Sequence, residues 1–257
     1  MNLNLENELL RIKDLDSRAK DVSEREEVLR RIKALYNQNQ TFKPLALLYL
    51  NILDRLFLEK ESISVVDGII EAKRIYDQHS RSEEVAEEYI RLLYNLSEKK
   101  DAKSELYIIG DEARRVYKQH SLSEEIAFFY SFVCLNWSFI QKEESTLKNT
   151  INQVKKVYNQ YPLSEEIALI YAMMLTNLSQ NQEEETALRI TAKEVRRIYD
   201  LFPHSEEIAI NYIIVLKELS MNQYKESTLK KTTLEAKRVY DKYLSSEEIA
   251  NKYLSGD

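Results

Sequence analysis

Apolar residues recur along this chain with the period of an α-helix. In a typical segment they follow steps of three and four residues: Ile167, Ala168, Tyr171, Leu175 and Leu178. Such steps place the side chains on one face of a helix and would scatter them over both faces of a strand. A second segment with the same period follows after a short polar stretch. The pattern therefore predicts pairs of amphipathic helices joined by short loops.

The helix pair is one copy of an internal repeat. A motif of the form (Arg/Lys)-(Ile/Val)-Tyr recurs in steps of 41 residues, with its tyrosine at Tyr76, Tyr117, Tyr158, Tyr199 and Tyr240. Each copy is followed by Ser-Glu-Glu-(Ile/Val)-Ala and then by a second tyrosine: Tyr89, Tyr130, Tyr171, Tyr212 and Tyr253. A weaker copy with Tyr36 and Tyr49 precedes them. Self-similarity at such a period is typical of stacked repeat folds, because no single pair can bury its apolar face alone.

We expect residues 1–257 to form a single all-α repeat domain. Residues 1–40 would supply N-terminal capping helices, 41–245 five helix pairs, and 246–257 a C-terminal capping helix. The ends of a stacked array need polar outer faces, and the last segment carries Asn, Lys and Ser where such a face would lie.

Residues that favour helix ends occur where this scheme places them. The serine of each Ser-Glu-Glu motif suits an N-cap, and the two glutamates suit the positive end of the helix dipole. Ser23 and Glu26 predict a capping box at the start of the second N-terminal helix. Pro162 and Pro203 follow two of the second helices, where a proline prevents the helix from continuing.

The alanine three residues before a tyrosine, as in Ala168 and Tyr171, the helix–turn–helix unit and the proline between repeats resemble tetratricopeptide repeats. The resemblance covers the chain from about residue 23 onward. The period departs from the family's 34 residues, and Ser-Glu-Glu-Ile-Ala replaces the Trp-x-x-Leu-Gly start. Period alone would equally fit HEAT repeats, and the wording of the repeat also resembles long-period arrays in bacterial signalling and defence proteins. The resemblance implies a right-handed superhelical α-solenoid whose first helices line a concave groove for a protein or peptide partner.

Composition agrees with long helices and excludes several other classes. The 257 residues include 3 Gly and 3 Pro, too few for the turns of a sheet-rich fold, and these glycines cannot form a phosphate-binding loop. The net charge of −6 weakly opposes binding to nucleic acid. The longest uncharged stretch, 126–141, is too short to span a membrane, and no signal peptide is visible. We therefore expect a cytoplasmic protein with no membrane contact.

No residues with metal-binding or catalytic spacing stand out. His79 and His120 occupy a repeat position that holds an aromatic ring in later copies, so we expect them to pack as rings. Cys134 lies in an apolar run and is expected to be a small buried hydrophobe. We therefore expect a protein that is not an enzyme and that holds no metal and no cofactor.

Two rows of charge recur with the repeat. The Ser-Glu-Glu motifs supply glutamates at helix starts, and basic pairs lie near the ends of the second helices: Lys73–Arg74, Arg114–Arg115, Lys155–Lys156, Arg196–Arg197 and Lys237–Arg238. The basic pairs resemble a stripe that tracks phosphates, which makes a nucleic-acid-binding solenoid an alternative function. We expect instead that the two rows partly neutralise each other, which leaves nucleic acid the less favoured partner.

The first helices carry an apolar strip beyond what the core requires. Opposite the core face, the helix at 85–97 has Glu87, Glu88 and Arg91, whereas the next three repeats have mainly apolar residues there. These residues are Phe128, Phe129 and Phe132, then Leu169, Ile170 and Met173, then Ile210, Asn211 and Ile214. A helix that is apolar all round is normally buried against something else. Three interpretations stay open: extra core inside a curved array, a groove for a partner, or self-association into a homo-oligomer.

The leading hypothesis is a non-catalytic scaffold or adaptor for a protein or peptide partner. The partner, an amphipathic helix or an extended apolar peptide, would bind in the concave groove. The expected groove residues are Phe128, Phe132, Leu169, Met173, Ile210 and Ile214, and Arg91 and Lys217 would orient an acidic partner.

Overall fold

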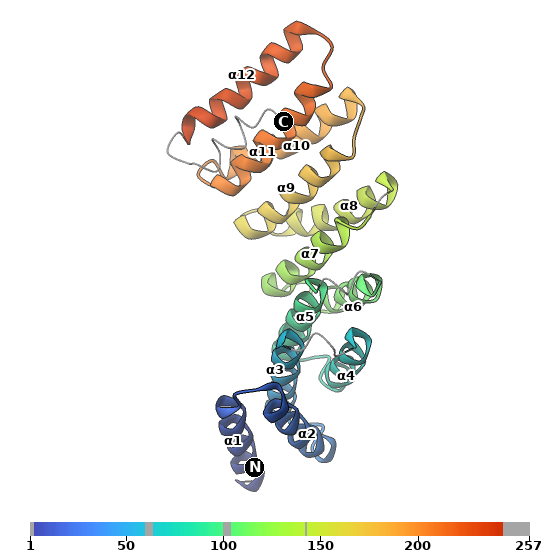
Figure 1. The fold of residues 1–257 in the computed structure, drawn as a ribbon, viewed down its shortest axis with the longest axis vertical. Coiled ribbons are helices and arrows are strands. Elements are labelled where there is room, and N and C mark those ends of the chain that lie inside the picture. Colours follow the sequence, from blue (N-terminus) through green and yellow to red (C-terminus); the bar gives the residue numbers. More distant parts are fainter. Residues whose placement is uncertain (1–2, 60–63, 100–103, 142, 244–257) are drawn as a thin grey trace. The chain divides into compact units, whose positions relative to one another are not determined.

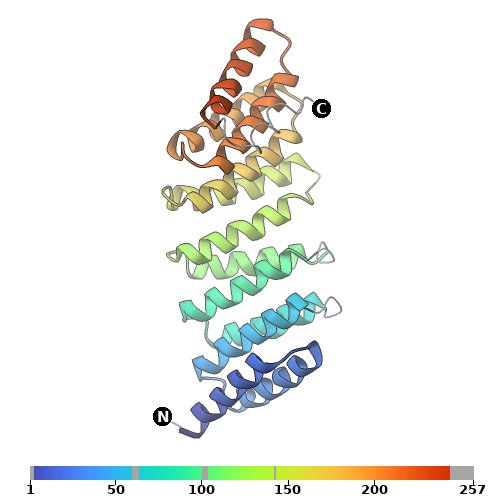
Figure 2. The ribbon, with the colours of Figure 1, turned by 60° about the vertical axis from the view of Figure 1, so that its left-hand side comes forward.

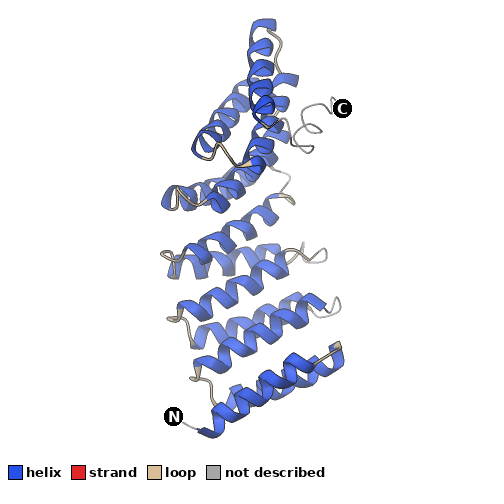
Figure 3. Ribbon diagram, turned by 90° about the vertical axis from the view of Figure 1, so that its left-hand side faces the viewer, coloured by secondary structure: helices blue, strands red, loops and turns tan. Residues whose placement is uncertain are grey.

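The computed structural model describes residues 3–59, 64–99, 104–141 and 143–243, and all regular secondary structure in these ranges is α-helical (Figure 3). The helices are α1 (Leu3–Arg18), α2 (Val22–Gln38), α3 (Lys43–Glu59), α4 (Val65–Gln78), α5 (Glu83–Ser97), α6 (Leu106–Gln119), α7 (Glu124–Ser138), α8 (Glu144–Gln160), α9 (Glu165–Gln180), α10 (Glu185–Leu201), α11 (Glu206–Met221) and α12 (Glu226–Lys242). The prediction of an all-α fold of successive packed helices is confirmed for the residues that the structure describes.

The helices form two compact units, Met1–Val133 and Cys134–Asp257, with the boundary inside α7. In the first unit α3 packs on α2 and α5, and α4 lies against both α3 and α5 (Figure 1). In the second unit α9 packs on α8 and α11, and α10 lies against both α9 and α11. Each unit therefore stacks first helices on one another, with α4 or α10 beside two of them (Figure 2).

Tyrosine rings join the second helix of one pair to the first helix of the next. Tyr76 stacks on Tyr89 with ring centres 5.1 Å apart, and Tyr158 stacks on Tyr171 at 5.3 Å. All four side chains are buried. Stacked aromatic rings stabilise a core beyond the area they bury. Residues from both predicted tyrosine ladders thus form the core between successive helix pairs.

Two predictions about helix ends are confirmed. Pro162 and Pro203 lie two residues beyond the last residues of α8 and α10. Ser82 is the N-cap of α5, where its Oγ accepts the backbone N–H of Val85 at 3.5 Å. Ser164 and Ser205 also take the N-cap positions of α9 and α11, but their side chains form no capping hydrogen bond.

The predicted capping box at Ser23 and Glu26 is wrong. The N-cap of α2 is Asp21, whose carboxylate accepts the backbone N–H of Glu24 at 2.9 Å, and Ser23 lies inside the helix. Glu24 in turn accepts the backbone N–H of Lys20 at 2.7 Å. The carboxylate of Asp21 thus satisfies a free N–H group of the first turn, and its charge suits the positive end of the helix dipole.

Close packing between α3 and α4 depends on a glycine. A Cβ atom added to Gly68 of α4 would lie 2.3 Å from Cζ of Phe57 on α3. Phe57 is buried, so its ring has little room to move away. The absence of a side chain at Gly68 is what lets the two helices approach.

The last copy of the motif, with Tyr253, and the expected capping helix at 246–257 lie outside the described residues. Within the described ranges, none of the helices combines the length and apolar character needed to cross a membrane.

Candidate functional site

Four aromatic rings gather on first helices of the first unit. They are Tyr94 of α5 and Phe128, Phe129 and Phe132 of α7. The ring centre of Tyr94 lies 5.0 Å from that of Phe132 and 5.5 Å from that of Phe129. Phe128 lies 5.6 Å from Phe132. All four are half-buried, so each keeps part of its surface open. This aromatic cluster contains two of the predicted groove residues, Phe128 and Phe132.

Arg91 lies beside the aromatic cluster and is bound by carboxylates of the same chain. Arg91 lies over the ring of Phe129, 5.8 Å from its centre. Its two Nη atoms lie 3.2 Å from Glu88 Oε1 and 3.1 Å from Glu125 Oε1. Arg91, which the sequence placed as a contact for an acidic partner, is therefore already paired with two acids of its own chain.

Burial keeps several of these carboxylates poorly solvated. Burial raises the pKa of Glu88, and the charges of Asp54 and Glu125 add to this effect. Burial and the charge of Glu125 likewise raise the pKa of Glu87. Burial also raises the pKa of Asp54, although Asn95 donates to its carboxylate at 2.9 Å. Asp54, Glu87, Glu88 and Glu125 form an acidic rim beside the aromatic cluster, with Arg91 as its shared cation.

The other predicted groove residues lie in the second unit. Leu169 and Met173 of α9 and Ile214 of α11 are half-buried, and Ile210 is 7% exposed. Lys217, near the end of α11, is half-buried as well. The apolar strip in this unit is therefore partly covered by its own neighbours and partly open.

A row of glutamates that sequence reasoning missed ties the second helices together. Its members are Glu71, Glu112, Glu194 and Glu235. Each contacts a tyrosine hydroxyl of the preceding first helix and a cation of the preceding second helix. Each also contacts an arginine three residues further along its own helix. The signal was available, since this glutamate ladder recurs at 41-residue steps with Gln153 in place of one member.

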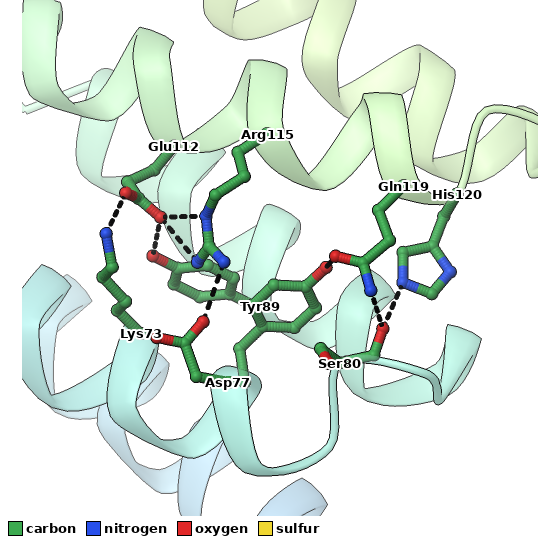
Figure 4. A network of polar contacts seen from close by, with 9 residues as sticks. Lys73, Asp77, Ser80, Tyr89, Glu112, Arg115, Gln119 and His120 are labelled. Atoms are coloured by element: carbon green, nitrogen blue, oxygen red, sulfur yellow. Dashed lines mark hydrogen bonds and ion pairs between the residues drawn. The ribbon is translucent and has the colours of Figure 1, made fainter.

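Figure 4 shows the arrangement around Glu112 of α6. Lys73 of α4 binds the carboxylate, Arg115 Nε donates to it at 2.9 Å, and the hydroxyl of Tyr89 donates to it at 3.3 Å. Arg115 also binds Asp77 at 2.8 Å. Burial opposes ionisation of Glu112, but hydrogen bonds from Lys73 and Arg115 outweigh it and hold the pKa below its usual value. Burial, together with the charge of Glu112, raises the pKa of Tyr89, so the hydroxyl remains a donor.

The expectation that the Ser-Glu-Glu glutamates neutralise the basic pairs is wrong for three of the cations. Lys73, Lys155 and Arg196 contact the ladder glutamate of the next second helix, not the glutamates of the Ser-Glu-Glu motifs. The basic pairs and the ladder occupy second helices at matching levels of successive repeats, whereas the Ser-Glu-Glu motifs begin first helices. A stripe that binds phosphates through Lys73 and Lys155 would have to break their close ion pairs.

The repeat position of the histidines holds a packing ring, as predicted. The ring of His120 lies 6.3 Å from that of Tyr76, and its Nε2 lies 2.9 Å from the carbonyl oxygen of Ser80. Tyr243 occupies the same position and donates at 2.8 Å to a carbonyl of the turn one repeat earlier. Cys134 is buried, also as predicted.

In the part of the chain that the structure describes, no three His, Cys, Asp or Glu side chains are grouped so that they could hold a metal ion. The sequence matches no family model, and comparison with curated proteins and with solved structures gives no significant match. Function therefore has to be inferred from the side chains themselves.

Proposed function

We propose that this chain is a tetratricopeptide-like scaffold that binds a protein partner through the aromatic cluster. The observation that carries the proposal is the grouping of four half-buried rings on α5 and α7. Aromatic side chains are favoured anchors at protein interfaces, because they bury a large area at a small cost in side-chain entropy. The right-handed superhelix with a concave groove belongs to this proposal.

The acidic rim favours a basic partner over the acidic one expected from Arg91. An acidic group could reach Arg91 only by displacing Glu88 or Glu125. A cation beside Glu87 and Glu88 would instead stabilise their ionised forms, which burial and neighbouring acids disfavour. We infer that the partner presents an amphipathic helix with an apolar face flanked by Lys or Arg.

The strip on α9 and α11 serves in this proposal as a second apolar contact surface. Leu169, Met173 and Ile214 keep part of their surface open, and Ile210 and Lys217 lie beside them on α11. A scaffold with two such surfaces holds two stretches of one partner or two different partners.

Nucleic acid remains the weaker alternative. Lys73 and Lys155 bind carboxylates of their own chain closely, and phosphate binding along the stripe would have to replace those contacts. The net charge of −6 acts in the same direction.

Selection of displayed peptides tests the proposed function. We expect the immobilised protein to enrich helical peptides with apolar residues at three- and four-residue steps and with basic residues beside them. Phe132→Asp should weaken their binding about tenfold or more, as loss of an interface anchor does. Phe139→Asp, which changes a 60% exposed ring that lies outside the aromatic cluster, should leave binding unchanged.

Three further results decide the alternatives. Glu125→Lys should weaken binding, because it reverses one charge of the acidic rim. Failure to enrich any peptide, or enriched peptides that bind folded Phe132→Asp as well as wild type, contradicts the proposal. A wild-type dimer that Phe132→Asp converts to a monomer would assign the aromatic cluster to self-association instead.

A further inference from the structure

A groove between α10 and α12 carries positive charge that the helix packing does not need. Tyr212 and Leu216 of α11 lie at its base, and it encloses about 490 Å³. Its charged residues are Lys193, Arg196, Lys231, Arg238 and Glu235. Four cations against one carboxylate give the lining a net charge of +3.

The preceding repeat contains a matching groove that serves as an internal comparison. It lies between α8 and α10 and encloses about 250 Å³. Asn152 and Ile190 occupy the positions that Lys193 and Lys231 occupy one repeat later. The repeat therefore packs with neutral residues at these two positions, and the two lysines are particular to the α10–α12 groove.

The cations of the two grooves also differ in their pairing. In the α8–α10 groove, Lys155 Nζ lies 2.7 Å from Glu194. In the α10–α12 groove, Arg196 and Arg238 share Glu235 at the longer distances of 3.7 and 3.6 Å. Both arginine side chains are more than half exposed. Such pairs contribute little to stability, so the arginines can turn toward another anion at small cost.

Lys193 and Lys231 have no partner among the described residues. Both side chains are exposed, and neither forms a hydrogen bond or ion pair with any residue that the structure describes. Like charges held together around one groove repel one another, and an anion bound between them removes that repulsion.

We propose that the α10–α12 groove binds a small organic phosphate of nucleotide size. Its phosphate would lie among the four cations, where arginine offers paired donors and lysine a compact charge. Its apolar or aromatic body would rest on Leu216 and Leu234, which also line the groove. The lining stretch of α12, 231–238, covers about 10 Å of helix axis, which matches a small molecule and not an extended polymer.

Titration calorimetry of the full chain with adenosine 5′-monophosphate tests the proposal. At about 50 mM salt, where screening is moderate, we expect saturable binding of this probe. Adenosine lacks the phosphate and inorganic phosphate lacks the apolar body, so each should bind at least about tenfold more weakly, a difference of about 1.4 kcal/mol.

The matching groove supplies the variants. Lys193→Asn with Lys231→Ile gives the α10–α12 groove the residues of its neighbour and should weaken binding about tenfold or more. Lys237→Asn with Lys230→Ile also removes two positive charges, but from residues of α12 that do not line the groove. This variant should leave binding unchanged. Melting temperatures of both double variants show whether each remains folded.

The proposal is overturned if adenosine 5′-monophosphate shows no saturable binding. It is equally overturned if the Lys193→Asn, Lys231→Ile protein binds the probe as tightly as wild type, or if inorganic phosphate binds as well as the nucleotide. Loss of binding in both double variants would mean that the net charge of the protein, and not the groove, governs binding. That result would also overturn the proposal. None of these results depends on a partner at the aromatic cluster.

Discussion

Lys155 Nζ of α8 lies 2.7 Å from Oε1 of Glu194 on α10, and the hydroxyl of Tyr171 on α9 donates to the same oxygen at 3.1 Å. One carboxylate thus joins three helices from two successive pairs. A buried polar network in which every member is satisfied favours one packing geometry over its alternatives. The glutamate ladder consequently favours one register of α4 on α2, of α6 on α4 and of α10 on α8.

Loss of a ladder glutamate should cost stability in proportion to the closeness of its contacts. Glu112→Gln removes the charge that holds Lys73 and Arg115, and we expect a loss of about 1.5–3 kcal/mol in the free energy of unfolding. The partners of Glu235 lie at 3.5–3.7 Å, so Glu235→Gln should lower the free energy of unfolding by less than about 1 kcal/mol. Urea denaturation followed by circular dichroism measures both, and equal costs would contradict the prediction.

The ladder should also make stability depend on pH. Burial opposes ionisation of Glu194, but hydrogen bonds from Lys155 and Tyr171 and the charges of Lys155 and Arg197 together outweigh it. The pKa of Glu194 is therefore lower in the folded than in the unfolded chain. The resulting stabilisation is present above the unfolded pKa, about 4.5, and is lost as pH falls through the folded pKa. The advantage of wild type over Glu194→Gln in unfolding free energy should therefore shrink between pH 7 and about pH 3.

Glu88 provides a control of opposite sign. Burial raises the pKa of Glu88 in the folded chain. The free energy of unfolding therefore falls as pH rises from the unfolded pKa of this group to its folded pKa. Wild type should accordingly gain stability relative to Glu88→Gln as pH falls over the same range. A common trend for the two variants would mean that global acid unfolding, and not these carboxylates, sets the profile.

Gly68→Ala should destabilise the protein even though alanine favours helix formation. The new methyl group would lie 2.3 Å from Cζ of the buried Phe57 ring, and overpacking of this kind costs about 1–3 kcal/mol. The gain in helix propensity is at most about 1 kcal/mol. Thermal unfolding checks the sign, and the penalty should fall in a Phe57→Leu background. Stabilisation by Gly68→Ala alone would show that α4 can shift away from α3.

Tyr171 offers a test of the core between helix pairs. It is 1% exposed and stacked on Tyr158, so Tyr171→Ala should cost about 3–5 kcal/mol, as truncation of large buried aromatic residues does. Tyr171→Phe keeps the ring and loses only the hydrogen bond to Glu194, at a cost of about 1 kcal/mol. Chemical denaturation of both variants separates packing from hydrogen bonding. A cost below about 1 kcal/mol for Tyr171→Ala would contradict the assigned core.

Periodicity was enough to predict the helix pairs and the buried tyrosines, because apolar spacing reports which face of a helix leaves water. It did not reveal the pairing of Lys73 with Glu112, because that contact depends on how closely one second helix approaches the next. The sequence shows which residues of a helix surface are charged, but which of them form ion pairs depends on how the neighbouring helix packs.

The aromatic cluster shows the same division. Phe128 and Phe132 were predicted from the contrast between one helix and the equivalent helix before it. The acidic rim was not, because Asp54 comes from α3, Glu88 from α5 and Glu125 from α7, which meet only after the first helices stack.

The contacts of the glutamate ladder join one repeat to the next, and this has an evolutionary consequence. Each repeat around Glu112 or Glu194 brings a carboxylate for the cation before it, and the same second helix carries a basic pair of its own. A duplicated block of 41 residues would therefore meet a complementary charge at both of its joins. Unequal recombination can lengthen or shorten such a gene by whole repeats without stranding a buried carboxylate, so array length is a trait that selection can adjust independently of the fold.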